Sequence, residues 1–235
     1  MICKFCTNDR KLIKAHVIPA GFFKRLRSGK QAPKMLTNTP GEFPKKSPVG
    51  VYDAKLVCRA CEDQFGDWDD YAQQLLKGEP SNGKKLFSGK RLVGYEVPTF
   101  EYAKMKLFFI SLLWRASASS HSFYRRISLG PFERRAKEMI ENQDPGSPEE
   151  FSVVLAKFDD ELGTCILDPH PEKWDGVNYV RFYLSGYVAY VKVDKRKAPL
   201  PHARFILSER QPLYIIARNL RGSKEFPLMK KITNS

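Results

Sequence analysis

Four of the five cysteines form two Cys-x-x-Cys pairs, Cys3 with Cys6 and Cys58 with Cys61. Two intervening residues let both thiolates of a pair reach one ion from a tight turn, and two pairs complete a tetrahedral shell. Such a shell has no open coordination position, which is typical of structural zinc. The spacing therefore predicts one structural Zn²⁺. About 50 residues separate the pairs, so an insertion is expected between the two knuckles.

Two other uses of paired cysteines stay open, a redox pair and an iron–sulfur cluster. The chain begins with Met1-Ile2-Cys3 and no apolar leader, so a cytoplasmic, reducing location is the default expectation. In that compartment metal ligation is favoured over disulfides. The fifth cysteine, Cys165, stands alone and is expected to be an inert thiol.

A histidine lies between the two cysteine pairs. His16 belongs to the segment 15–19, which reads Ala-His-Val-Ile-Pro and follows Cys6 by ten residues. An imidazole titrates near neutral pH, so it can accept a proton from water under physiological conditions. A structural, hydrogen-bonding role for His16 stays open. The other three histidines have no metal-like or catalytic neighbours in the sequence and are expected in loops; they are His121, His170 and His202.

The order of these motifs resembles that of the HNH (ββα-metal) endonucleases in their zinc-stapled form. That family has Cys-x-x-Cys, a strand bearing His-Ile/Val-x-Pro, an Asn, and then Leu-Val/Leu-Cys-x-x-Cys at the start of a helix. The resemblance covers residues 1–70, about a third of the chain. The matching parts of this chain are, in order, Cys3 and Cys6, residues 16–19, Asp53, residues 56–61, and a helix expected from Glu62.

The resemblance implies a treble-clef (ββα) module in which His16 is the general base of DNA phosphodiester hydrolysis, assisted by Mg²⁺ or Mn²⁺. Ala15 stands where the family often has an acidic metal ligand, and Asp53 replaces the Asn that orients the histidine or its loop. Carboxylates suit hard cations, so Glu62 and Asp67 are candidate replacement ligands. A bacterial or phage origin fits the family. The alternative is a catalytically inactive zinc-finger protein that binds nucleic acid or a protein partner.

The charge of the chain indicates a polyanionic partner. The net charge is +14 and the pI about 9.6, which suits DNA first and RNA second, although a merely basic protein is the alternative. One basic cluster between the cysteine pairs is expected to contact phosphates, or else to be a solvated loop; it comprises Lys24, Arg25, Arg27 and Lys30. Aromatic residues of the expected strands could stack on bases, but core positions are favoured; they are Tyr179, Phe182, Tyr183, Tyr187 and Tyr190.

The hydrophobic pattern predicts an α+β protein. Apolar residues at helical spacing predict helices, and period-two segments rich in Val, Ile, Tyr and Phe predict strands. The expected helices are 62–76, 100–120 and 132–142, and the expected strands are 151–158, 179–193 and 204–217. The predicted organisation is a treble-clef module (1–76), a basic linker (77–97) and a helix-plus-antiparallel-sheet domain (98–235). The most apolar stretch, 107–114, is too short to span a bilayer, so no membrane partner is expected.

Overall fold

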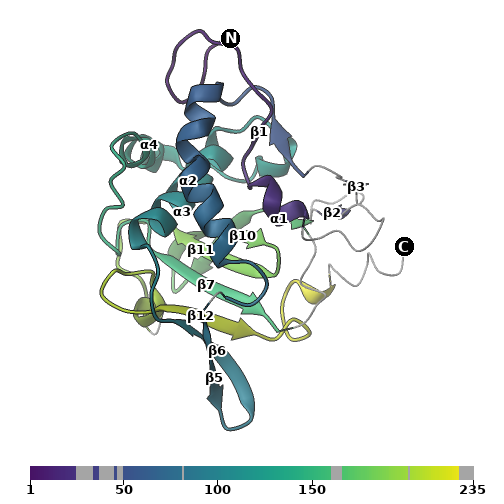
Figure 1. Cartoon of the computed structure of the whole chain (residues 1–235), viewed down its shortest axis with the longest axis vertical. Coiled ribbons are helices and arrows are strands. Elements are labelled where there is room, and N and C mark those ends of the chain that lie inside the picture. Colours follow the sequence, from purple (N-terminus) through teal and green to yellow (C-terminus); the bar gives the residue numbers. More distant parts are fainter. Residues whose placement is uncertain are drawn as a thin grey trace.

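A seven-stranded sheet covered by helices dominates the described part of the chain (Figure 1). The computed structural model describes residues 1–24, 34–36, 45–46, 50–80, 82–159, 166–200 and 202–227. The strand order is β5-β6-β12-β7-β11-β10-β9, antiparallel throughout except for the parallel pair β12–β7. The strands are β5 (Lys84–Ser88), β6 (Arg91–Val97), β7 (Val153–Phe158), β9 (His170–Trp174), β10 (Val177–Leu184), β11 (Tyr187–Lys192) and β12 (Leu213–Arg218). The predicted α+β class is confirmed in this form.

The three long helices pack together on one face of this sheet. They are α2 (Arg59–Leu75), α3 (Tyr102–Ala118) and α4 (Glu133–Glu141), each within two or three residues of the predicted bounds. The helix α3 is buried along nearly its whole length, because its apolar residues surround the helix and meet both the sheet and α2. Among the described residues, none of the helices has the length and apolar character that a membrane span requires.

Short elements join the N-terminal residues to α2. The strands β1 (Ala15–His16) and β4 (Tyr52–Asp53) pair antiparallel, and the short helix α1 (Ala20–Lys24) follows β1. The described fragments β2 (Lys34–Leu36), β3 (Lys45–Lys46) and β8 (Ile166–Leu167) form a separate three-stranded sheet. The β1–β4 pair and the three-stranded sheet therefore both contain strands from the long insertion between the cysteine pairs.

One hydrophobic core connects the cysteine-bearing segment to the large sheet. The Phe5 ring, between Cys3 and Cys6, packs edge-on against Phe65 of α2 at 5.5 Å and against Trp114 of α3 at 5.1 Å between centroids. The same cluster of buried residues continues to Phe182 on β10. The predicted modules 1–76 and 98–235 therefore share a core.

The segment 77–97, predicted as a basic linker, instead contains the hairpin of β5 and β6. Its inner part belongs to the sheet because Tyr95 and Val97 are buried and β6 pairs with β12. The lysines of β5 suggest a linker in the sequence, but β5 is an edge strand, where exposed charges are common. The prediction was wrong because it weighed composition over the alternation in residues 91–97.

The other strand predictions need smaller corrections. The segment 179–193 is two strands, separated by a turn in which Ser185 and Gly186 have φ of 53° and 90°. The segment 204–217 is a strand only from Leu213, and His202–Phe205 form a 3₁₀ turn. The edge strand β9 was not predicted because it contains Pro171, which an edge position tolerates.

Candidate functional site

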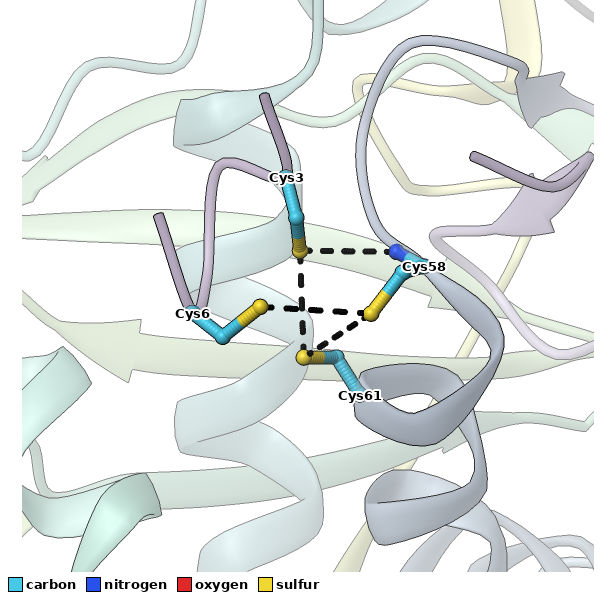
Figure 2. A group of neighbouring side chains, drawn as sticks. All are labelled: Cys3, Cys6, Cys58 and Cys61. Atoms are coloured by element: carbon cyan, nitrogen blue, oxygen red, sulfur yellow. Dashed lines mark hydrogen bonds between the residues drawn. The ribbon is translucent and has the colours of Figure 1, made fainter. Parts of the chain in front are cut away.

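The four paired cysteines converge on one point (Figure 2). Their ligand atoms all lie within 4.8 Å of one another, and three sulfur pairs are 3.5, 3.7 and 3.9 Å apart. A tetrahedral thiolate shell with metal–sulfur bonds of about 2.3 Å places its sulfurs about 3.8 Å apart. No two of these sulfurs form a disulfide. The four thiols are therefore arranged so that they could hold a metal ion.

Local backbone structure fixes both knuckles. Cys3 accepts a hydrogen bond from the backbone N–H of Cys58 at 3.4 Å, which connects the two pairs directly. In the first knuckle Thr7 has a φ of 61° and its N–H bonds to the carbonyl of Cys3 at 2.9 Å. In the second, Cys58 is the N-cap residue of α2, so Cys61 lies in the helix's first turn. The two pairs thus come from a tight turn and a helix start, as Figure 2 shows.

The thiols of the cluster differ in their acidity. Burial opposes ionisation of Cys3, but backbone hydrogen bonds around it lower its pKa to about 7. Burial and the three neighbouring thiols raise the pKa of Cys61 well above its usual range. A cation at the centre of the cluster would stabilise the negatively charged thiolates, because cysteine binds a metal in its deprotonated form.

The strand β1 brings His16 beside the start of α2. The backbone of His16 lies close enough to Glu62, directly after Cys61, to lower the pKa of its carboxyl, against the larger raising effect of burial. The imidazole ring lies edge-on to Tyr52, with centroids 6.1 Å apart, and 6.5 Å from the ring of Phe23. The backbone of His16 and the carboxyl of Glu62 are therefore close in space.

Glu62 carries an orphaned acceptor. Its Oε2 is buried and has no hydrogen-bond partner. Burial, followed by the repulsion of Asp69, raises the pKa of Glu62 above its usual value, although Arg115 and the His16 backbone act in the opposite direction. A buried carboxylate oxygen without a partner is costly.

A buried arginine, Arg115, connects α3, α2 and β1 at this point. Arg115 of α3 donates to both carboxylate oxygens of Asp69 on α2, at 2.6 and 2.8 Å, and to the carbonyl of His16 at 3.1 Å. Its remaining donors reach the carbonyl and hydroxyl of Ser111, at 3.3 and 3.1 Å. All five guanidinium N–H groups are satisfied in this way. Arg115 therefore fixes the backbone of His16 relative to both long helices.

Arg115 and Asp69 are the functional residues that the sequence motifs did not identify. One signal was present: Arg115 is a charge inside an otherwise apolar helical stretch, where an unpaired charge is not tolerated. Its partner follows from helical geometry, because Glu62 and Asp69 are seven residues apart and share one face of α2. Nothing in the sequence indicated that the guanidinium would also hold the carbonyl of His16.

The structure gives Asp53 a different role from the predicted catalytic one. Residues directly opposite in the β1–β4 pair are Ala15 with Asp53 and His16 with Tyr52, so Asp53 and His16 point to opposite faces. The Asp53 carboxylate accepts hydrogen bonds from the backbone N–H of Lys55 and the hydroxyl of Ser119. It also accepts from both the backbone N–H and the hydroxyl of Ser120, and all four distances are 2.6–3.0 Å. Although burial opposes it, these donors hold the pKa of Asp53 below its usual range. Asp53 thus anchors β4 to the end of α3.

Asp67 does not join the candidate site. Its side chain is exposed on α2. Its charge adds to the effect of Glu101 in raising the pKa of Lys104. Five residues separate it from Glu62, which turns it about 140° around a helix. The prediction of Asp67 as a cation ligand was therefore wrong, because Asp67 lies on a different face of α2 from Glu62. Asp69 is the carboxylate that lies on the same face as Glu62.

Several other predicted residues are only partly described. Arg25, Arg27, Lys30 and Cys165 lie outside the described residues, as does the side chain of Lys24. His170 lies in β9 and accepts a hydrogen bond from Arg181, while His202 is in a 3₁₀ turn, so two histidines expected in loops belong to elements. The five strand aromatics are buried, as the core interpretation predicted; they are Tyr179, Phe182, Tyr183, Tyr187 and Tyr190.

Comparison of the chain with protein-family models, with curated proteins and with solved structures finds no match. The function must therefore be argued from the site itself.

Proposed function

We propose that the chain is a zinc-stapled, HNH-like endonuclease that hydrolyses phosphodiester bonds of DNA, with His16 as general base. The single observation that carries the proposal is the position of His16 and Glu62. A histidine on a short strand lies beside a carboxylate in the first turn of the helix that begins at the second cysteine knuckle. This is the relation between base and ligand that the resemblance implies.

The cysteine cluster supports the treble-clef part of the proposal. A turn carrying Cys3 and Cys6, a strand pair β1–β4, and a helix entered through Cys58 and Cys61 follow in the order of that module. Zinc suits the four thiolates better than harder cations do, because thiolate is a soft ligand. In this role the zinc holds the two ends of the insertion together and takes no part in the reaction.

The residues beside His16 fit a weakly held divalent cation. Mg²⁺ usually retains several waters and binds through one or two carboxylates together with substrate phosphates. Glu62 offers a buried, unpartnered oxygen for this purpose. When bound, the cation would supply charge neutralisation at the phosphate and at the leaving oxygen.

The chain's own residues have separate tasks in this proposal. The imidazole of His16 takes a proton from the attacking water, the task of a general base. Arg115 keeps the His16 backbone in place through the carbonyl, and Asp69 keeps Arg115 in place. Lys24, Arg25, Arg27 and Lys30 are proposed to contact phosphates near His16, because they follow it closely in the chain.

A second function, binding of nucleic acid without cleavage, has an observation of its own. Within the described residues, the four cysteines are the only group of three or more potential ligand side chains. Ala15 provides no ligand, and the Asp53 carboxylate already accepts hydrogen bonds from Lys55, Ser119 and Ser120. A cation at His16 therefore depends on Glu62 and on substrate oxygens.

Nicking of supercoiled plasmid DNA separates the two functions. The purified protein is incubated with plasmid plus Mg²⁺ or Mn²⁺, and the control omits the divalent cation, since a chelator would also remove zinc from the cysteines. The nuclease proposal predicts nicked and linear DNA only with added cation. Binding of the plasmid without cleavage under any cation would favour the second function.

A further inference from the structure

The hairpin of β5 and β6 extends beyond the rest of the molecule (Figure 1). Only the inner residues Gly94–Val97 of β6 pair with β12, whereas the β5–β6 pairing continues outward to Ser88 opposite Arg91. The outer part is therefore a two-stranded ribbon, with no third strand among the described residues. We call the segment 82–93 the arm; it comprises this ribbon and the start of β5, where Lys84 and Lys85 lie opposite Glu96 and Tyr95.

The arm is uniformly basic. It contains four cations and no acidic residue, and all four are exposed; they are Lys84, Lys85, Lys90 and Arg91. Lys85 forms an ion pair with Glu79 at 2.8 Å, at the base of the arm. The others have no ion pair among the described residues. This concentration of one sign gives the arm a field that attracts polyanions.

An aromatic side chain stands among these charges. Phe87 is 58% exposed and lies opposite Leu92, next to an irregularity in the pairing between Leu86 and Phe87. Irregularities of this kind redirect a side chain and increase the local twist of a ribbon. A single exposed apolar residue is ordinary, but here Lys85 stands two residues before it on the same strand, and Arg91 is next to its partner Leu92 on the other.

We propose that the arm is a second contact surface for duplex DNA, with its four cations on phosphates and Phe87 against the bases. The major groove is wide enough for a two-stranded ribbon, and an apolar side chain there can contact base edges such as the thymine methyl group. The proposal extends the proposed function but does not depend on it, because binding by the arm needs no cleavage at His16.

Protection of a sheet edge is another explanation for the lysines, but it accounts for fewer of the arm's residues. Lysines on an edge strand prevent sheets from pairing edge to edge, which would explain Lys84 and Lys85. It does not explain Lys90 and Arg91 in the turn and on the inner strand. It also leaves Phe87 unexplained, because an exposed aromatic on an edge favours association rather than preventing it.

The test measures binding of a labelled DNA duplex of about 20 base pairs by anisotropy at several salt concentrations, without added divalent cation. The arm variant changes Lys84, Lys85, Lys90 and Arg91 to Ser. The control variant removes the same charge from exposed cations elsewhere, by changing Lys195, Lys197, Arg204 and Arg210 to Ser. Circular dichroism establishes that both variants are folded.

The arm variant should lose about 0.9 of the slope of log affinity against log salt for each phosphate contact removed, and the control should keep most of its slope. Phe87→Ser should weaken binding roughly tenfold with an unchanged slope, since an apolar contact with the bases does not release counterions. Equal slopes for arm and control variants would overturn the proposal. So would an arm variant that changes only the oligomeric state in sedimentation, which would assign the arm to self-association.

Discussion

At the scale of single residues, Glu62 and Asp53 illustrate how two buried carboxylates near one histidine take different roles. Asp53 accepts four hydrogen bonds, three of them at Oδ2, so it is stable as an anion that anchors the backbone. Glu62 has one buried oxygen without a partner, and its pKa is raised by burial. A group that costs stability in the folded protein is a candidate for function, because structure alone does not explain its retention.

Glu62→Gln should stabilise the protein at neutral pH. A carboxyl whose pKa is raised above its ordinary 4.5 destabilises the folded state once pH exceeds that range, because its charged form is disfavoured there. The gain should disappear below pH 4.5, where Glu62 is protonated in both states. Thermal unfolding at pH 4 and pH 7 measures it. DNA cleavage should fall by roughly 10²-fold, as for other lost electrostatic groups.

Asp63→Asn is the matched control for this substitution, because its side chain is 62% exposed on the same helical turn. It should change neither stability nor cleavage appreciably. A Glu62→Gln protein that is less stable than wild type at pH 7 would show that the carboxylate is structural. Equal gains at both pH values would contradict a role for its charge.

At the scale of elements, the sequence predicted what depends on local spacing. The cysteine pairs and α2 follow from residues a few positions apart, and the structure has them where expected. The role of Asp53 could not be predicted, because its partners Ser119 and Ser120 are more than 60 residues away. The choice of Asp67 over Asp69 failed because composition marks an acidic helix face without identifying which acid faces His16.

Cys58→Ser should release the bound metal and unfold the knuckles. Structural zinc contributes about 10–16 kcal/mol in small zinc modules, which matches or exceeds the about 5–15 kcal/mol that stabilises a typical domain. Metal analysis should give about one zinc per wild-type chain and almost none for the variant. Cys165→Ser serves as the control and should retain the zinc. Stoichiometric iron in the wild-type protein, or no metal, would contradict this assignment.

At the scale of the whole molecule, the cysteine knuckles and the sheet belong to one packed unit. The ring of Phe5 packs against Phe65 of α2 and Trp114 of α3, and Arg115, next to Trp114, holds both Asp69 and the His16 carbonyl. Both contacts join residues far apart in the sequence. The two regions should therefore unfold together, whereas separate modules would unfold independently. The position of His16 therefore depends on α3 as well as on the elements that carry the cysteines.

Unfolding of the zinc-loaded protein should be a single transition. Zinc release, followed with a chromophoric chelator, should occur at the same temperature as the loss of sheet signal in circular dichroism, because the two regions share one core. Two separate transitions, with zinc lost well before the sheet melts, would show that residues 1–76 fold independently.

The substitution His16→Ala tests the central claim most directly. In the nicking assay the variant should cleave plasmid about 10²–10⁴-fold more slowly than wild type, which is the usual contribution of a general base. Its zinc content and DNA affinity should be unchanged, and Lys14→Ala, on the same segment, should retain wild-type cleavage. A His16→Ala protein that is folded, zinc-loaded and as active as wild type would contradict the account.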